Sequence, residues 1–150
     1  MKLSLSIVTA AFASLAAADF WIYSEQDFTS DITSEHFKFY NSKPDCSDVT
    51  TGSIAQQRKD DVSGGKNGVR CEGCLDGDLR VIEFNNDMGH FTIYKDRNWE
   101  MVDLDDKVVG NCEPDDSHTY TCPIPPTGQP AQGGSIIFCT SEHNADAINS

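Results

Sequence analysis

The sequence lacks the features by which many enzymes and membrane proteins are recognised. After residue 18 no apolar run approaches the length of about 20 residues that spans a bilayer. Lys and Arg form no cluster, which argues against binding to nucleic acids or to anionic lipids. The hydrolase motif G-x-S-x-G, the zinc motif H-E-x-x-H and the phosphate-binding loops are missing. We therefore expect no membrane span, no nucleic-acid partner, no metal and no cofactor.

The first 18 residues have the composition of a cleavable signal peptide. Lys2 supplies one positive charge, and the stretch from Leu3 to Ala17 contains neither a charge nor a proline. The small residues Ala16-Ala17-Ala18 fit an A-x-A cleavage site. The sequence therefore predicts a signal peptide at 1–18 and one secreted, extracellular domain at 19–150.

The chain is acidic, with a formal net charge of −13. The acidic residues are spread along it, which favours solubility in an extracellular space over a dedicated acidic site. Asp76-Gly77-Asp78 and Asp103 to Asp106 offer oxygen ligands, but neither continues into a twelve-residue calcium loop.

Six cysteines follow the predicted signal peptide, and an even number in a secreted chain indicates structural disulfides. Many pairings are compatible with the sequence; Cys112 and Cys122, which flank a turn-rich segment, are the favoured local pair. Cys71-Glu72-Gly73-Cys74 has the spacing of zinc and redox motifs, but it lacks a second such pair and a flanking strand and helix. The predicted disulfide cysteines are Cys46, Cys71, Cys74, Cys112, Cys122 and Cys139.

Hydrophobic periodicity favours strands over helices. Several short runs are rich in aromatic and β-branched residues, some of them alternate, and turn-forming residues separate them. Short connections between residues 79 and 112 predict an antiparallel meander. The expected strands are Phe20–Tyr23, His36–Tyr40, Leu79–Phe84, His90–Lys95, Trp99–Leu104, Lys107–Cys112, His118–Cys122 and Ser135–Thr140.

No amphipathic helix of three turns is present. Ile54–Lys59 and the C-terminal tail could each form one short helical turn, and the segment Pro123–Gly134, rich in proline and glycine, predicts a long exposed loop. The predicted fold is all-β: a disulfide-stapled, small antiparallel barrel or sandwich of about eight strands.

Four histidines, at positions 36, 90, 118 and 143, could act as general acids or bases. In size, acidity, disulfides and β content the chain resembles small secreted fungal ribonucleases. Such enzymes need a carboxylate base, a histidine acid and an arginine beside the phosphate. That resemblance implies a site of His36, Glu83, Arg97 and His118, although the main helix of the family has no counterpart.

A carbohydrate-binding module is a further alternative. Aromatic rings can stack on sugars when exposed, and Trp21, Trp99 and Tyr94 are the candidates, with Tyr23 beside them. Because each lies in a strand pattern, packing in the core is the favoured role for these rings.

The broadest resemblance is to small secreted cysteine-rich proteins of filamentous fungi, which include effectors and elicitors of the hypersensitive response in plants. The alanine-rich leader, the six cysteines and the runs Asp19–Tyr23, Gly68–Cys74 and Gly89–Arg97 carry it. It implies a compact β domain, monomeric or weakly dimeric, whose partner is a host protein or a cell-wall component. It implies no catalytic residue.

Overall fold

The computed structural model describes residues 18–29, 32–74, 76–126 and 128–150, and this part of the chain is built mainly from β-strands. It also contains two short helices, α1 (Cys46–Thr51) and α2 (Asp146–Asn149), and the 3-10 turn η1 (Lys95–Arg97). No helix in the described ranges is long and apolar enough to cross a membrane. In chain order, the strands are β1 (Ala18–Thr29), β2 (Ile32–Tyr40), β3 (Gln56–Gln57), β4 (Gly68–Glu72), β5 (Val81–Asn86), β6 (Gly89–Tyr94), β7 (Glu100–Val102), β8 (Val108–Pro114), β9 (Thr119–Ile124) and β10 (Gln129–Ser141).

The strands form one antiparallel sheet in the order β3-β2-β1-β10-β8-β7-β6-β5-β4, and β9 pairs with β10 beside this path. An isolated bridge between Arg58 and Val69 brings the two ends of the path together, so the sheet is a nearly closed barrel. Gly68 permits this closure, because its φ is +143° and a Cβ atom there would lie 2.7 Å from the Gln57 carbonyl oxygen. The predicted all-β barrel is confirmed, as is the meander of β5 to β8.

The interior of the barrel holds the main hydrophobic core. Phe20 and Ile22 of β1, Phe37 and Phe39 of β2, and Phe84 of β5 are all fully buried there. The Phe84 ring contacts Phe39 edge-on at 5.1 Å between centroids, which joins β2 to β5 across the barrel. Each such side chain stabilises the fold by about 1.5–3 kcal/mol through burial.

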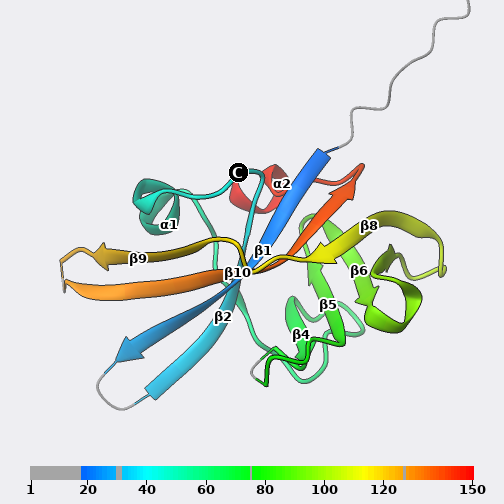
Figure 1. Cartoon of the computed structure of the whole chain (residues 1–150), viewed down its shortest axis with the longest axis horizontal. Coiled ribbons are helices and arrows are strands. Elements are labelled where there is room, and N and C mark those ends of the chain that lie inside the picture. The colour runs from blue at the N-terminus through cyan, green and yellow to red at the C-terminus, as the bar shows by residue number, and fades with distance from the viewer. Residues whose placement is uncertain (1–17, 30–31, 75, 127) are drawn as a thin grey trace, which may run out of the picture.

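A second, smaller hydrophobic cluster lies apart from the main core. Figure 1 shows β1, β2, β9 and β10 reaching toward one side of the view, with β4, β5, β6 and β8 toward the other. A smaller buried cluster of Val49, Cys122 and Ala131 lies between α1, β9 and the first half of β10. Strand β10 therefore contributes to both clusters, with Ile137 and Cys139 in the main core and Ala131 in the smaller cluster.

A β-bulge in β10 connects these two packing arrangements. Ile22 is opposite Ile137 but Tyr23 is opposite Ser135, so Ile136 has no partner in β1. An extra residue of this kind shifts the alternation of side chains between the faces of a strand. Beyond the bulge, Ser135, Gly133 and Ala131 therefore lie on the face away from the barrel core.

All six cysteines form disulfides: Cys46–Cys122, Cys71–Cys74 and Cys112–Cys139. The predicted disulfides are present, but the favoured pair Cys112–Cys122 is wrong. The pairing of β8 with β10 places Cys112 directly opposite Cys139. Cys122 lies in β9, which pairs with the other half of β10 and is linked through its disulfide to α1.

Two other predictions of local structure are also wrong. The segment predicted as an exposed loop at Pro123–Gly134 contains the end of β9 and the first half of β10, including Gln129–Gly134. Ile54–Lys59 contains the short strand β3 and no helical turn, whereas the C-terminal turn is present as α2. The predicted signal peptide lies outside the described residues except for Ala18, which begins β1.

Disulfide mapping tests this topology. Peptide mass analysis of the unreduced protein should recover Cys46 joined to Cys122 and Cys112 joined to Cys139. A peptide that joins Cys112 to Cys122 would contradict the pairing of β9 with β10.

Removing Cys46–Cys122, which links residues 76 apart, should lower the free energy of unfolding by about 4 kcal/mol. Removing Cys71–Cys74, which links residues 3 apart, should cost only about 1–2 kcal/mol.

Candidate functional site

The face of β1 and β2 that points away from the barrel core carries an unusual set of buried polar side chains. Strand register places Tyr23 opposite Lys38 and Glu25 opposite His36. Glu25 is 1% exposed, Lys38 6% and His36 9%. Because charged side chains are rarely buried without a specific arrangement of partners, this cluster is the first candidate for a functional site.

The Glu25 carboxylate is the centre of the cluster. Its Oε1 atom accepts a hydrogen bond from His36 Nε2 at 2.7 Å and lies 2.9 Å from Lys38 Nζ. Its Oε2 atom accepts a hydrogen bond of 2.5 Å from the Tyr120 hydroxyl on β9. Three donors from two different strands thus converge on one carboxylate.

These donors keep Glu25 ionised. Burial by itself would raise the pKa of Glu25, but the hydrogen bonds from His36, Tyr120 and Lys38 outweigh it and lower the pKa below its usual range. The same burial raises the pKa of the Tyr120 phenol, and the hydrogen bond to the Glu25 carboxylate raises it further. Tyr120 therefore remains a proton donor to Glu25 at any physiological pH.

Three tyrosines pack together beside the carboxylate and join β9 to β1 and β2. The Tyr23 ring stacks on Tyr120 with centroids 5.7 Å apart and meets Tyr40 edge-on at 5.3 Å. The Tyr23 hydroxyl shares a hydrogen bond of 2.9 Å with His118 Nδ1, and Tyr40 shares one of 3.0 Å with Ser53. Burial raises the pKa of Tyr40 to about 12. All three phenols are therefore neutral packing and hydrogen-bonding groups.

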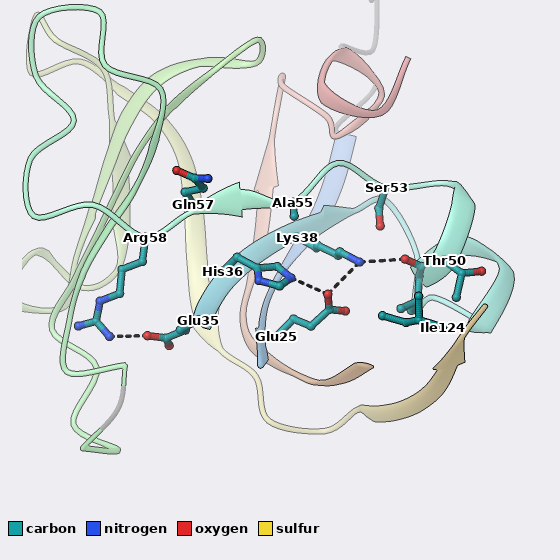
Figure 2. Close-up of a pocket in the computed structure, with 11 residues that line it drawn as sticks. Glu25, Glu35, His36, Lys38, Thr50, Ser53, Ala55, Gln57, Arg58 and Ile124 are labelled. Atoms are coloured by element: carbon teal, nitrogen blue, oxygen red, sulfur yellow. Dashed lines mark hydrogen bonds and ion pairs between the residues drawn. The ribbon is translucent and has the colours of Figure 1, made fainter. Parts of the chain in front are cut away.

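A pocket of about 580 Å³ opens beside this cluster. Glu25, His36 and Lys38 form part of its wall, and Figure 2 shows the His36 and Lys38 side chains directed at the Glu25 carboxylate. Thr50 of α1 and Ile124 of β9 lie at one end of the view, and the ion pair of Arg58 with Glu35 lies at the other. The remaining lining residues are Val49, Ser53, Ala55 and Gln57.

Helix α1 is held firmly in place as a wall of this pocket. Asp45 caps its N-terminus by accepting from the Ser47 and Asp48 amides, and Asp48 in turn accepts from the Asp45 amide. The Cys46–Cys122 disulfide ties the helix to β9. Lys38 Nζ also donates to the Val49 carbonyl at 2.8 Å, which joins the helix directly to the Glu25 cluster.

The structure does not bring the four residues of the ribonuclease alternative together. His36 lines the pocket, but its carboxylate partner is Glu25 rather than Glu83. Glu83 instead pairs with Arg70 at 2.7 Å and with His90 at 2.9 Å on β4 to β6. Arg97, in η1, pairs with Glu100 and Asp106. His118 contacts Tyr23 beside β9.

The three candidate sugar-stacking aromatics also lie apart. The Trp21 indole donates to Asp115 at 2.8 Å and its ring packs on Phe138. Trp99 packs against the main core, as expected for a structural role. Tyr94 lines a separate hollow of about 610 Å³ with charged neighbours that include Arg80 and Lys95. The three rings do not form a shared platform.

Sequence reasoning missed Glu25, Lys38 and Tyr120. The run His36–Tyr40 alternates polar and aromatic residues, which is typical of a strand with one face in solvent, yet all five are buried. Only the register that pairs Glu25 with His36 reveals the cluster.

Comparison with known proteins adds no identification. No protein-family model, no curated protein and no solved structure matches this chain. The function is therefore argued from the pocket itself.

The ionised Glu25 carboxylate makes the stability of the fold depend on pH. The pKa of Glu25 is lower in the folded than in the unfolded protein, so its contribution to stability is complete above the unfolded pKa of about 4.3 and is lost as the pH falls through the folded pKa. Glu25→Gln leaves Lys38 without its buried counter-charge and should lower the free energy of unfolding at pH 7 by about 3 kcal/mol. Urea unfolding from pH 7 to pH 3 should show this difference from wild type shrinking below about pH 4.5. A difference that stays constant over this range would contradict the ionised, hydrogen-bonded Glu25.

Gly133 on β10 leaves room for the Tyr120 ring. A Cβ atom on Gly133 would lie 2.4 Å from the Tyr120 ring, whereas one on the adjacent Gly134 would meet Thr119 at an ordinary 3.5 Å. Gly133→Ala should displace Tyr120 from Glu25 and cost about 2 kcal/mol in thermal or urea unfolding. Gly134→Ala is the matched control and should cost less than about 1 kcal/mol. Equal effects from the two substitutions would show that the Tyr120 contact contributes nothing.

Proposed function

We propose that the protein is a secreted interaction protein of the effector or elicitor type, which acts on or is recognised by a plant host, and that the pocket beside Glu25 holds its ligand. The signal-peptide-like leader supports export, and three disulfides suit an oxidising extracellular compartment. The resemblance to secreted cysteine-rich fungal proteins supports the host-directed role.

The observation that carries the pocket assignment is the burial of charge around an open hollow. Removing Glu25 and Lys38 from water costs several kcal/mol per ion, and apolar residues of similar volume often stabilise a fold as well or better. Such a cluster is therefore poorly explained by stability alone. Its position in the wall of an open hollow of about 580 Å³ makes recognition of a ligand the simplest use for it.

The geometry favours binding over acid–base catalysis. A general base works best with a pKa near the operating pH. The pKa of Glu25 is lowered, and three hydrogen bonds engage its carboxylate, so it is a weak base. At the other end of the pocket, Arg58 is already paired with Glu35.

Infiltration of purified protein into leaves tests the proposal. The exposed Ala55 lines the pocket, so Ala55→Trp should fill it from outside without touching the core. Wild type should induce cell death or defence markers at micromolar dose, and Ala55→Trp should reduce the response several-fold. Ile54→Trp is the matched control, because Ile54 is 51% exposed and does not line the pocket; it should behave like wild type.

Two outcomes would count against the proposal. The absence of any leaf response to wild type would contradict the host-directed function. A response that is equal for wild type and Ala55→Trp would separate that function from the pocket.

A further inference from the structure

We propose that the pocket beside Glu25 binds an uncharged sugar ring, one unit of a neutral extracellular polysaccharide. This inference rests on the proposed function and specifies the ligand class for the same pocket. It follows from the charge balance of the wall, the chemistry of the rim and the rigidity of the frame.

The charge balance excludes a strongly charged ligand. Lys38 and His36 both contact the Glu25 carboxylate, and Arg58 contacts Glu35. The Lys38 ammonium and the Arg58 guanidinium are thus each already paired with a lining carboxylate. An anionic ligand would have to displace one of these carboxylates within a protein of net charge −13, and a cationic ligand would have to displace Lys38 or Arg58.

The remaining lining groups suit a neutral polyhydroxyl ligand. Thr50, Ser53 and Gln57 supply hydroxyl and amide groups at the edge, and each type can accept as well as donate hydrogen bonds. Thr50 Oγ1 donates its proton to the Cys46 carbonyl at 2.8 Å, so toward a ligand this oxygen acts as an acceptor. Acceptors matched to sugar hydroxyls are what such a site requires.

The same pocket has apolar walls. Val49, Ala55 and Ile124 line it together with the polar groups. A pyranose ring presents hydroxyls around its edge and C–H groups on its faces, so it needs both kinds of surface at once. Ligand sites of this type combine apolar walls with a few placed polar groups.

The frame of the pocket is organised before any ligand binds. The Cys46–Cys122 disulfide fixes α1 to β9, and Lys38 joins the helix to the Glu25 cluster. A rigid site loses little entropy on binding, which matters for sugars because their individual hydrogen bonds replace bonds to water.

The hollow around Tyr94 is the competing site. It offers an aromatic ring, but its exposed neighbours are engaged in ion pairs, with Asp78 paired to both Arg80 and Lys95. It also lacks a buried polar group in its lining. We therefore place the sugar beside Glu25 and use Tyr94→Ala to test the other location.

Titration calorimetry with defined oligosaccharides tests the inference. The probes are cellohexaose, laminarihexaose and chitohexaose, which are neutral, and the hexamer of galacturonic acid, which is anionic. At least one neutral probe should bind wild type, and the anionic hexamer should bind at least about tenfold more weakly. Ala55→Trp should weaken the neutral probe at least about tenfold, whereas Ile54→Trp and Tyr94→Ala should retain wild-type affinity. Thermal unfolding of each variant checks that its fold is intact.

The outcomes separate this inference from the proposed function. Binding of no neutral probe, stronger binding of the anionic hexamer, or loss of binding in Tyr94→Ala instead of Ala55→Trp would each overturn the sugar assignment. A leaf response that still depended on Ala55 in those cases would leave the proposed function standing. Conversely, pocket-dependent sugar binding without any leaf response would support the ligand class and contradict the host-directed function.

Discussion

Burial of β1 and β2 on both faces is the constraint on which the rest of the structure depends. One face presents Phe37 and Phe39 to the barrel core, so the opposite face must be covered by something else. That cover comes from β9 and α1, and the bulge at Ile136 turns the first half of β10 toward the same side. The disulfide from α1 to β9 then stabilises the cover. The small domain thus gains a second interior without a second domain.

The chemical character of that second interior is what distinguishes this protein from a simple stapled barrel. An apolar filling would satisfy the packing requirement, yet the chain places an ionised carboxylate there with a lysine, a histidine and a tyrosine as its donors. The Lys38 ammonium balances the charge of the Glu25 carboxylate, so the cluster is compatible with stability. The cluster also forms part of the wall of an open pocket, and its Glu25 and Lys38 charges are paired with each other. Such a wall selects ligands by their hydrogen-bonding pattern rather than by their net charge.

Much of the barrel could be predicted from local sequence, and the site could not. Strands β5 and β6 alternate, and strong turn signals separate the strands from β5 to β8, so their meander could be predicted. The first half of β10 could not be predicted, because the prolines and glycines at 123–134 are typical of a loop. In the structure, Gly133 instead leaves room for the Tyr120 ring. The cluster depends on the contact between Glu25 and Tyr120, which lie 95 residues apart. Neither residue sits in a motif, and contacts at such separations follow from strand register, which local patterns do not reveal. For the same reason, chain order alone grouped Glu83 and Arg97 with His36, although each has other partners.

The measurement that bears most directly on this account is amide shift mapping by NMR during titration with a neutral oligosaccharide. If the Glu25 pocket is the binding site, the largest shifts should fall in His36–Lys38, α1 and the segment 52–58, while β5 and β6 remain unchanged. Shifts centred on Tyr94 and Lys95, or no shifts at ligand concentrations far above the protein, would contradict the assignment of this pocket as the functional site.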